Sequence, residues 1–238
     1  MCARFTQFGI QQVAQLFGLT APVPDLEDRY NIAPTDPVAV VRRGARGREL
    51  AWMQWGLVPA WANDPSIGTR LINARCETVT EKPAFRTAFK RRRCLVPTSG
   101  FYEWSGPKNA RQPYFIHFKH QPVAFAGLWE TWERPEGFLE TFTILTTHPN
   151  ETIERLHDRM PVVIRERDFE SWLHAEGAAE RFFAPLGNNE IEVWPVGKRV
   201  GNVRCDDPEL LAKVEAILEA TPAKPKSKPA DPAQGELF

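Results

Sequence analysis

Short runs rich in β-branched and aromatic residues, interrupted by glycine and proline, fill the middle of this chain. Segments 38–43 and 49–57 flank the turn 44–47 and therefore predict a β-hairpin. Further strands are predicted at 94–96, 101–104, 114–119, 123–133, 140–147 and 191–196. With 21 prolines and 15 glycines, the pattern favours many short strands over a helical bundle.

Helices are expected between and around these strands. Apolar residues recur at helical spacing after Thr6, which can cap a helix over 6–17. The stretch 22–37 is too irregular for a strand and too apolar for a linker, so we expect a buried loop there. Further helices are predicted over 83–93, 150–156, 166–174 and 207–218.

The length of 238 residues suits one β-rich domain as well as two. Prolines and lysines replace any apolar periodicity near the end, which predicts a folded region 1–220 and a disordered tail 221–238. No apolar run approaches the roughly 18 residues of a membrane helix and no leader is evident, so a cytoplasmic protein is expected.

Composition restricts the chemistry as well. Four cysteines and five histidines show no spacing typical of a metal site, so neither a metal nor another cofactor is expected. The 30 basic and 30 acidic residues cancel, so a nucleic-acid surface would have to be a local patch.

The N-terminus offers an unusual nucleophile. Removal of Met1 would leave Cys2 with a free α-amine beside its thiol. Such an aminothiol attacks an aldehyde through nitrogen to give an imine, and then through sulfur to close a thiazolidine ring. The α-amine has a reference pKa of about 7.7–8.0, against about 10.4 for lysine, so it is the better nucleophile at neutral pH. The alternative is that Cys2 lies in a frayed terminus without a role.

Two ionisable residues further along are candidates for proton transfer. Glu103 lies between two aromatic residues, where desolvation would raise the pKa of its carboxyl; a solvent-facing strand glutamate is the alternative. His157 is followed by Asp158 and Arg159 and then by an X-Pro bond. Three ionisable groups in one constrained loop favour a site role for His157 over a structural one.

Other candidate residues have a structural explanation as well. Asn73 lies in the mixed segment 71–78, where its amide needs partners if it is buried. Arg86 belongs to a basic helical face within 83–93, which either follows DNA phosphates or is simply solvated. Trp61 follows a proline-containing loop and either stacks on bases or joins the core.

Seven stretches, taken in order, resemble the SOS response-associated peptidase (SRAP) family, whose members are also called abasic-site-processing proteins. The matching stretches are 1–5, 30–34, 55–59, 72–78, 100–104, 157–161 and 200–203. The resemblance implies a single α+β domain with a β-rich, tunnel- or barrel-like core of mostly antiparallel strands and flanking helices. It also implies a groove for single-stranded DNA and covalent capture of abasic sites, which shields them from strand cleavage.

The family's catalytic positions fall on Cys2, Asn73, Glu103 and His157 of this sequence. By this resemblance Cys2 is the nucleophile, and His157, titrating near neutrality, protonates the ring oxygen of the closed sugar. Glu103 carries protons during imine and thiazolidine formation. Asn73 holds the amine or the sugar by neutral hydrogen bonds.

Positions that contact DNA are also implied. The predicted set, which includes the basic helical face, is Arg4, Asn31, Pro34, Trp61, Arg75, Arg86 and Arg159. The arginines would neutralise phosphates and Trp61 would stack on a base. The sequence departs from the family at Ala3, usually glycine, and at Ala62, often a second aromatic residue.

The closing residues suggest a protein partner. Gln234, Leu237 and Phe238 resemble the peptides by which bacterial replication and repair proteins dock on the DNA sliding clamp. Such a tail would recruit a monomeric, nucleoid-associated protein to replication forks, where single-stranded abasic sites arise.

Three functions follow from the sequence. The first is an abasic-site crosslinking enzyme with weak lyase activity and slow reversal of the crosslink. The second is a cysteine or N-terminal-nucleophile peptidase, for which the Met1–Cys2 bond is the evident self-substrate. The third is a non-catalytic single-stranded DNA binding module, whose binding would survive Cys2→Ala.

Overall fold

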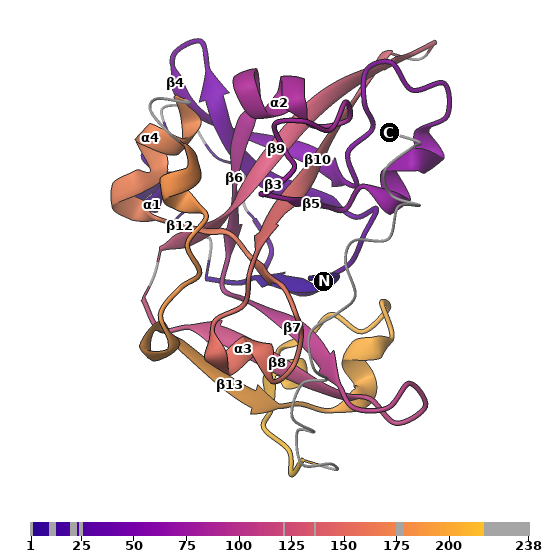
Figure 1. The fold of residues 1–238 in the computed structure, drawn as a ribbon, viewed down its shortest axis with the longest axis vertical. Helices are drawn as coiled ribbons and strands as arrows, with labels where there is room; N and C mark the ends of the chain where they lie inside the picture. The colour runs from indigo at the N-terminus through magenta and orange to yellow at the C-terminus, as the bar shows by residue number, and fades with distance from the viewer. Residues whose placement is uncertain are drawn as a thin grey trace.

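Five strands close into a small barrel, which fills the upper half of Figure 1. The computed structural model describes residues 2–9, 13–19, 23, 26–120, 122–135, 137–174 and 179–216. The barrel strands are β3 (Pro37–Gly44), β4 (Gly47–Trp55), β6 (Arg93–Thr98), β9 (Val123–Arg134) and β10 (Gly137–Thr147). Neighbouring strands are antiparallel, except that β10 and β4 run parallel and close the ring.

Three short strands lengthen the barrel at its edges. These strands are β5 (Asn73–Arg75), β11 (Met160–Pro161) and β12 (Val163–Arg165). β12 pairs with β9, whereas β5 and β11 both pair with the last residues of β10. The segments that carry Asn73 and His157 therefore meet at one end of the barrel.

A second, antiparallel sheet lies below the barrel in Figure 1. Its strands, in spatial order, are β13 (Ile191–Pro195), β8 (Gln112–Phe118), β7 (Gly100–Ser105), β1 (Phe5–Gln7) and β2 (Arg29–Ile32). β1 is an inner strand, because it pairs with β7 on one side and with β2 on the other. The residues that precede β1, including Cys2, therefore continue from the middle of the second sheet and not from its edge.

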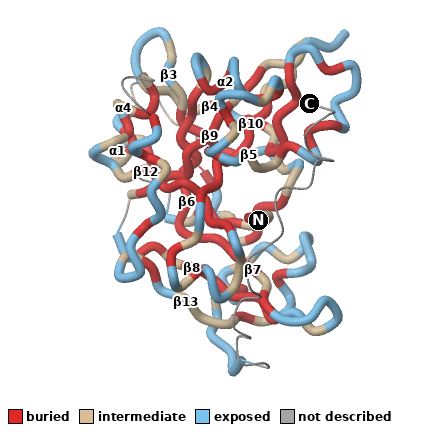
Figure 2. The backbone as a smooth tube through the Cα atoms, viewed as in Figure 1, coloured by how far each residue is buried: buried red, intermediate tan, exposed pale blue. Residues whose placement is uncertain are grey.

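An apolar core runs from the barrel interior to the second sheet. Phe5 of β1 makes edge-to-face contacts with Trp55 and Phe125 of the barrel, with ring centroids 5.1 and 5.7 Å apart. All three rings are fully buried, and Figure 2 shows buried backbone along the barrel strands and β7. Truncating such a ring to alanine costs about 3–5 kcal/mol. Phe5 therefore anchors the chain three residues after Cys2.

Short helices and 3-10 turns complete the fold. They are α1 (Val13–Leu16), α2 (Arg86–Arg91), α3 (Glu151–Glu154), α4 (Phe169–Leu173), η2 (Pro65–Arg70), η3 (Glu166–Asp168), η4 (Ala179–Phe182), η5 (Asn188–Glu190), η6 (Lys198–Gly201) and η7 (Pro208–Leu211). α2 and α4 cover the outside of the barrel, where Phe89 packs on Trp172. The indole of Trp172 also donates to the Cys94 carbonyl at 2.9 Å.

The predicted strands are confirmed with small shifts at their ends, but two predicted helices are wrong. The stretch 22–37, expected to be a loop, contains the strand β2, which pairs with β1. Residues 5–7 form β1, and only Val13–Leu16 is helical. The hydroxyl of Thr6, expected to cap a helix, donates to the Gly100 carbonyl at 3.2 Å in the neighbouring strand. Strand pairing and ring burial thus override the local helical pattern.

The predicted helix over 207–218 shrinks to η7. Asp207 caps it as expected, accepting from the Glu209 amide at 3.1 Å. Beyond η7 the chain extends, and Lys213 bridges to Val196 beside β13. The end of that predicted helix and the predicted tail, 217–238, lie outside the described residues. In the described part of the chain, no helix has the length and apolarity needed to cross a membrane.

Candidate active site

Cys2 is buried rather than frayed, since only 1% of its surface is exposed. Its thiol donates to the Arg4 carbonyl at 3.7 Å, and that carbonyl also accepts from the Tyr102 amide at 3.0 Å. Burial, reinforced by the negative charge of Glu103, raises the pKa of the Cys2 thiol well above its ordinary value. The thiol therefore keeps its proton at neutral pH until a base removes it.

Asn73 holds the backbone of the nucleophile. Its amide nitrogen donates to the Cys2 carbonyl at 2.8 Å from the first position of β5. Its side-chain oxygen, Oδ1, is buried and accepts no hydrogen bond from the described residues. Since an acceptor without a donor is costly to bury, this oxygen can receive an N–H from an amine beside Cys2.

Glu103 is buried in β7, with 3% of its surface exposed. Burial raises the pKa of its carboxyl to about 7, although the positive amino terminus of the chain opposes this shift. The 3% exposure excludes a solvent-facing side chain, and the raised pKa agrees with the desolvation expected in this aromatic neighbourhood. A carboxyl that titrates near 7 can both donate and accept a proton at neutral pH.

His157 lies just after α3, whose cap is the side chain of Asn150. Its Nδ1 accepts from the Arg159 backbone amide at 3.0 Å, and a neutral ring with this bond carries its proton on Nε2. Burial lowers the pKa of His157 to about 4. The carboxylate of Asp158, 2.9 Å from Nδ1, opposes this shift. The expectation that His157 titrates near neutrality is therefore wrong: at pH 7 its imidazole is neutral.

Electrostatics places these groups around one point. Glu103 acts on the thiol of Cys2, and Asp158 acts on Glu103. The charge of the amino terminus lowers the pKa of both Glu103 and His157. The structure thus brings Cys2, Asn73, Glu103 and the loop of His157 together from four separate parts of the sequence. Among the described residues, no group of His, Cys, Asp or Glu could hold a metal ion here or elsewhere.

The residues predicted to contact DNA divide into two groups. Trp61 is 54% exposed, Arg75 and Arg86 are also exposed, and Pro34 is half-buried in the turn after β2. The remaining members of the set, Arg4, Asn31 and Arg159, point into the protein and are described next.

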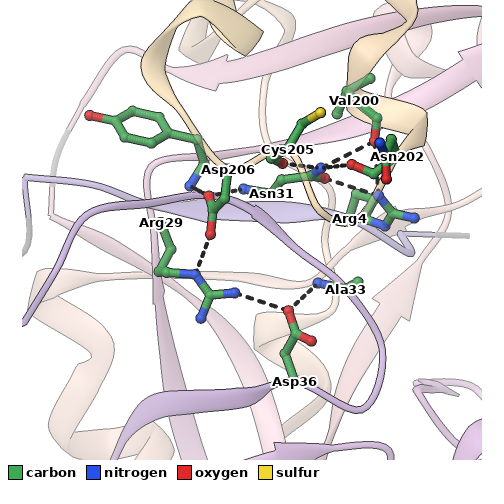
Figure 3. Close-up of polar contacts among 10 residues, drawn as sticks. Arg4, Arg29, Asn31, Ala33, Asp36, Val200, Asn202, Cys205 and Asp206 are labelled. Atoms are coloured by element: carbon green, nitrogen blue, oxygen red, sulfur yellow. Dashed lines mark hydrogen bonds and ion pairs between the residues drawn. The ribbon is translucent and has the colours of Figure 1, made fainter.

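Asn31 links the strand β2 to the segment after η6 (Figure 3). It is 1% exposed, and its Nδ2 lies within hydrogen-bond distance of the carbonyls of Val200, Asn202 and Cys205. Its Oδ1 accepts from Nη1 of Arg4 at 3.0 Å. Arg4 and Asn31 therefore hold the arm of Cys2 against the C-terminal part of the fold.

Two carboxylates that the sequence did not reveal support the same region (Figure 3). Asp206 accepts from the amides of Tyr30 and Asn31 at 2.5 and 2.9 Å. Arg29 bridges Asp206 and Asp36 at 2.5 and 3.0 Å. No periodicity or motif could have signalled the contacts of Asp206, because its partners lie at the other end of the sequence.

Arg159 is also directed inward, with 8% of its surface exposed. Its two terminal nitrogens donate to the two carboxylate oxygens of Glu77 at 2.6 and 2.8 Å. Nη2 also donates to the Thr146 carbonyl at 2.7 Å. Its guanidinium is therefore engaged within the protein, whereas that of Arg75 faces solvent.

The comparisons with known proteins agree with this architecture. The family model for "SOS response associated peptidase (SRAP)" matches residues 1–203. The chain is 36% identical over 222 residues to the abasic site processing protein YoqW of Bacillus subtilis (strain 168), covering 89% of this chain and 99% of YoqW. It is 31% identical over 238 residues to the abasic site processing protein HMCES of Mus musculus, covering 81% and 67%.

A solved structure from Bacteroides thetaiotaomicron superposes with a TM-score of 0.80 over 90% of this chain and 100% of that chain. At 23% identity this likeness shows the fold alone. With a family model that spans the barrel, the second sheet and all four candidate catalytic residues, the chain belongs to the SRAP family.

Proposed function

We propose that this protein captures abasic sites in single-stranded DNA as a thiazolidine crosslink to Cys2, after removal of Met1. The main support is the buried position of Cys2, whose carbonyl is held by Asn73 and whose thiol interacts with a carboxyl that titrates near 7. The names of the relatives, which describe abasic site processing, agree with this substrate.

The pKa values divide the proton transfers differently from the family-based expectation. An abasic sugar is mostly a closed ring, and opening it to the aldehyde requires a proton on the ring oxygen. Glu103, about half protonated at pH 7, can supply this proton, whereas a neutral imidazole is a much weaker acid. We therefore assign the proton donor of ring opening to Glu103. His157 instead donates a hydrogen bond from its Nε2–H to the reacting sugar.

The bond changes balance with a single carboxyl. In ring opening, the ring oxygen takes a proton from Glu103 and the anomeric hydroxyl returns its own proton to Glu103, so the carboxyl is protonated again when the aldehyde has formed. The α-amine of Cys2 adds to the aldehyde carbon, and the resulting hydroxyl leaves as water when Glu103 delivers a proton, which gives an iminium ion. The ionised Glu103 then takes the thiol proton as sulfur adds to the same carbon. The nitrogen keeps its remaining hydrogen, Glu103 ends protonated, and the net loss is one water. Oδ1 of Asn73 orients the amine during attack.

Intact mass and denaturing gel electrophoresis test this proposal directly. Wild type, Cys2→Ala and Cys2→Ser are each incubated with a single-stranded abasic oligonucleotide. We expect a heat-stable adduct, formed without borohydride, only with wild type, at the mass of the Met-less protein plus DNA minus water. An adduct that persists in Cys2→Ala would exclude this chemistry. Absence of any adduct would favour the peptidase or the plain DNA-binding module.

Two side activities follow from the same intermediate. If the reaction stops at the iminium ion, β-elimination cleaves the strand and gives weak lyase activity. Ring opening of the thiazolidine, with Glu103 returning a proton to sulfur, regenerates the iminium ion. Addition of water to the iminium carbon then releases the amine and the aldehyde, which reverses the crosslink. Both should depend on Cys2 and can be measured on the same gels.

DNA binding is assigned to the exposed members of the predicted set, Trp61, Arg75 and Arg86. Base–aromatic stacking contributes about 1–3 kcal/mol, so Trp61→Ala should weaken binding to single-stranded DNA about tenfold. Trp52 is a matched control because it is also 54% exposed but lies on β4. Equal losses in Trp61→Ala and Trp52→Ala, measured by fluorescence anisotropy, would remove Trp61 from the DNA surface.

The clamp-docking peptide remains a separate proposal, since Gln234, Leu237 and Phe238 lie outside the described residues. We expect deletion of 234–238 to abolish binding to purified sliding clamp and to leave crosslinking unchanged. Unchanged clamp binding by the deletion variant would refute this role for the tail.

A further inference from the structure

The ion pair between Glu77 and Arg159 is a candidate for a role in the chemistry, because one of its members also contacts His157. Glu77 follows β5, the strand that carries Asn73. Although burial opposes ionisation, the Arg159 guanidinium lowers the pKa of the Glu77 carboxyl below its ordinary value. With two parallel N–H···O bonds and an Arg159 side chain only 10% exposed, this pair has a fixed geometry.

Arg159 joins the pair to His157 through its backbone. While its side chain binds Glu77 and the Thr146 carbonyl, its amide N–H donates to Nδ1 of His157 at 3.0 Å. This bond favours the tautomer with the proton on Nε2, whereas the carboxylate of Asp158, 2.9 Å from Nδ1, favours a proton on Nδ1. A shift of Arg159 would release the bond and let both tautomers form.

We propose that Glu77 is a positioning residue of the crosslinking site: through Arg159 it fixes the orientation and the Nε2–H tautomer of His157. This inference rests on the proposed function, in which His157 donates a hydrogen bond to the reacting sugar. Glu77 itself touches neither Cys2 nor Asn73 through any hydrogen bond or ion pair among the described residues. Its other ion-pair contact, Nε2 of His148 at 3.2 Å, involves a side chain that is 75% exposed and is therefore screened by solvent.

A competing role for Glu77 makes a different prediction. If Arg159 is a phosphate contact, Glu77 competes with DNA for its guanidinium, and losing Glu77 would tighten DNA binding without slowing the chemistry. If Glu77 positions His157, its loss slows the reaction at saturating DNA. Rate and affinity must therefore be measured separately.

The experiment compares wild type, Glu77→Gln and Glu190→Gln in single-turnover crosslinking with an abasic oligonucleotide at several concentrations. Glutamine has the same shape as glutamate but cannot form the charged pair. Glu190→Gln is the matched control because it breaks another bidentate pair, with Arg165 at 2.6–3.0 Å, which joins β12 to η5. The tautomer of His157 is read in parallel from 15N shifts of labelled histidine in the free protein at pH 7.

We expect Glu77→Gln to lower the maximal crosslinking rate about three- to fivefold, less than replacement of His157 itself, and to give a mixture of His157 tautomers, while Glu190→Gln changes neither. A maximal rate within twofold of wild type would overturn the inference, whatever happens to DNA affinity. So would a slower rate with the Nε2–H tautomer intact, because Glu77 would then act by another route.

Two further measurements distinguish loss of the charged pair from damage to the fold and from failure of the proposed crosslinking function. Glu77→Asp keeps the charge and should recover at least part of the rate, whereas general damage to the fold would lower the thermal midpoint of both variants. If wild type forms no adduct, the proposed function fails, yet the tautomer comparison still decides whether Glu77 controls the ring of His157.

Discussion

Glu103 is buried and His157 is half-buried at the same site, and desolvation moves their pKa values in opposite directions. The carboxyl rises to about 7 and the imidazole falls to about 4, because a poorly solvated site favours the neutral form of each. The carboxyl therefore titrates near neutrality and the imidazole does not. Residue type alone would assign the acid–base role to the histidine, and the difference shows that the environment decides it.

The largest effect should come from removing the carboxyl. Glu103→Gln keeps the shape but cannot transfer a proton, so we expect the crosslinking rate at pH 7 to fall about 100-fold or more. His157→Gln keeps a hydrogen-bond donor, so its crosslinking rate should fall about tenfold or less. Single-turnover gels measure both rates. A larger loss in His157→Gln would return the acid role to the imidazole.

Glu103 and His157 should also change the pH dependence of the free energy of unfolding in opposite directions. The pKa of Glu103 is raised above its unfolded value, so the native state binds more protons between about pH 4.5 and 7, and stability falls as pH rises through that window. The shift corresponds to about 3 kcal/mol. The pKa of His157 is lowered, so stability rises with pH between about 4 and 6.5; its side chain is 26% exposed, which makes this slope smaller.

Denaturant unfolding of the single variants separates these slopes. In His157→Gln the falling slope of Glu103 should stand alone, and in Glu103→Gln the rising slope of His157 should remain. In wild type the two slopes partly cancel. The free energy of unfolding of wild type should therefore vary less between pH 4.5 and 6.5 than that of His157→Gln. Identical pH dependence in all three proteins would contradict the opposite shifts.

The pH dependence of the crosslinking rate should show the same assignment. The reaction needs protonated Glu103, pKa about 7, and a neutral α-amine, reference pKa about 7.7–8.0. The rate should therefore rise about tenfold per pH unit below 7 and fall by a similar factor above 8. We expect His157→Gln to keep both limbs and Glu103→Gln to lose the falling one. A falling limb that persists in Glu103→Gln would assign the acid elsewhere.

The smallest effect is expected at Asn73, which holds Cys2 without transferring a proton. Asn73→Ala removes the 2.8 Å bond to the Cys2 carbonyl, worth about 0.5–1.5 kcal/mol, so the rate should fall about two- to tenfold. Both limbs of the pH profile should stay in place, because neither Glu103 nor the amine has changed. A displaced limb would show that Asn73 also tunes a pKa.

Runs of β-branched and aromatic residues between glycines and prolines by themselves determined most of the strands, because strand propensity and turn chemistry are local properties of the sequence. The ordered motifs likewise determined the family. They also singled out Cys2, Asn73, Glu103 and His157 as candidate catalytic residues, since the chemistry proposed for an N-terminal cysteine is a property of that residue and its place in the chain. The helix expected over 6–17 was wrong in its first half, because pairing of β1 with two strands outweighs a local pattern.

Only the tertiary structure decided which groups are charged. The pKa values of Glu103 and His157 depend on how completely the barrel end and the second sheet exclude water, and no local pattern encodes that. The inward direction of Asn31 and Arg159 likewise depends on partners from distant segments, such as Glu77. Solvation and long-range pairing are properties of the assembled fold, whereas strand pattern and nucleophile identity are local and can be read from the chain.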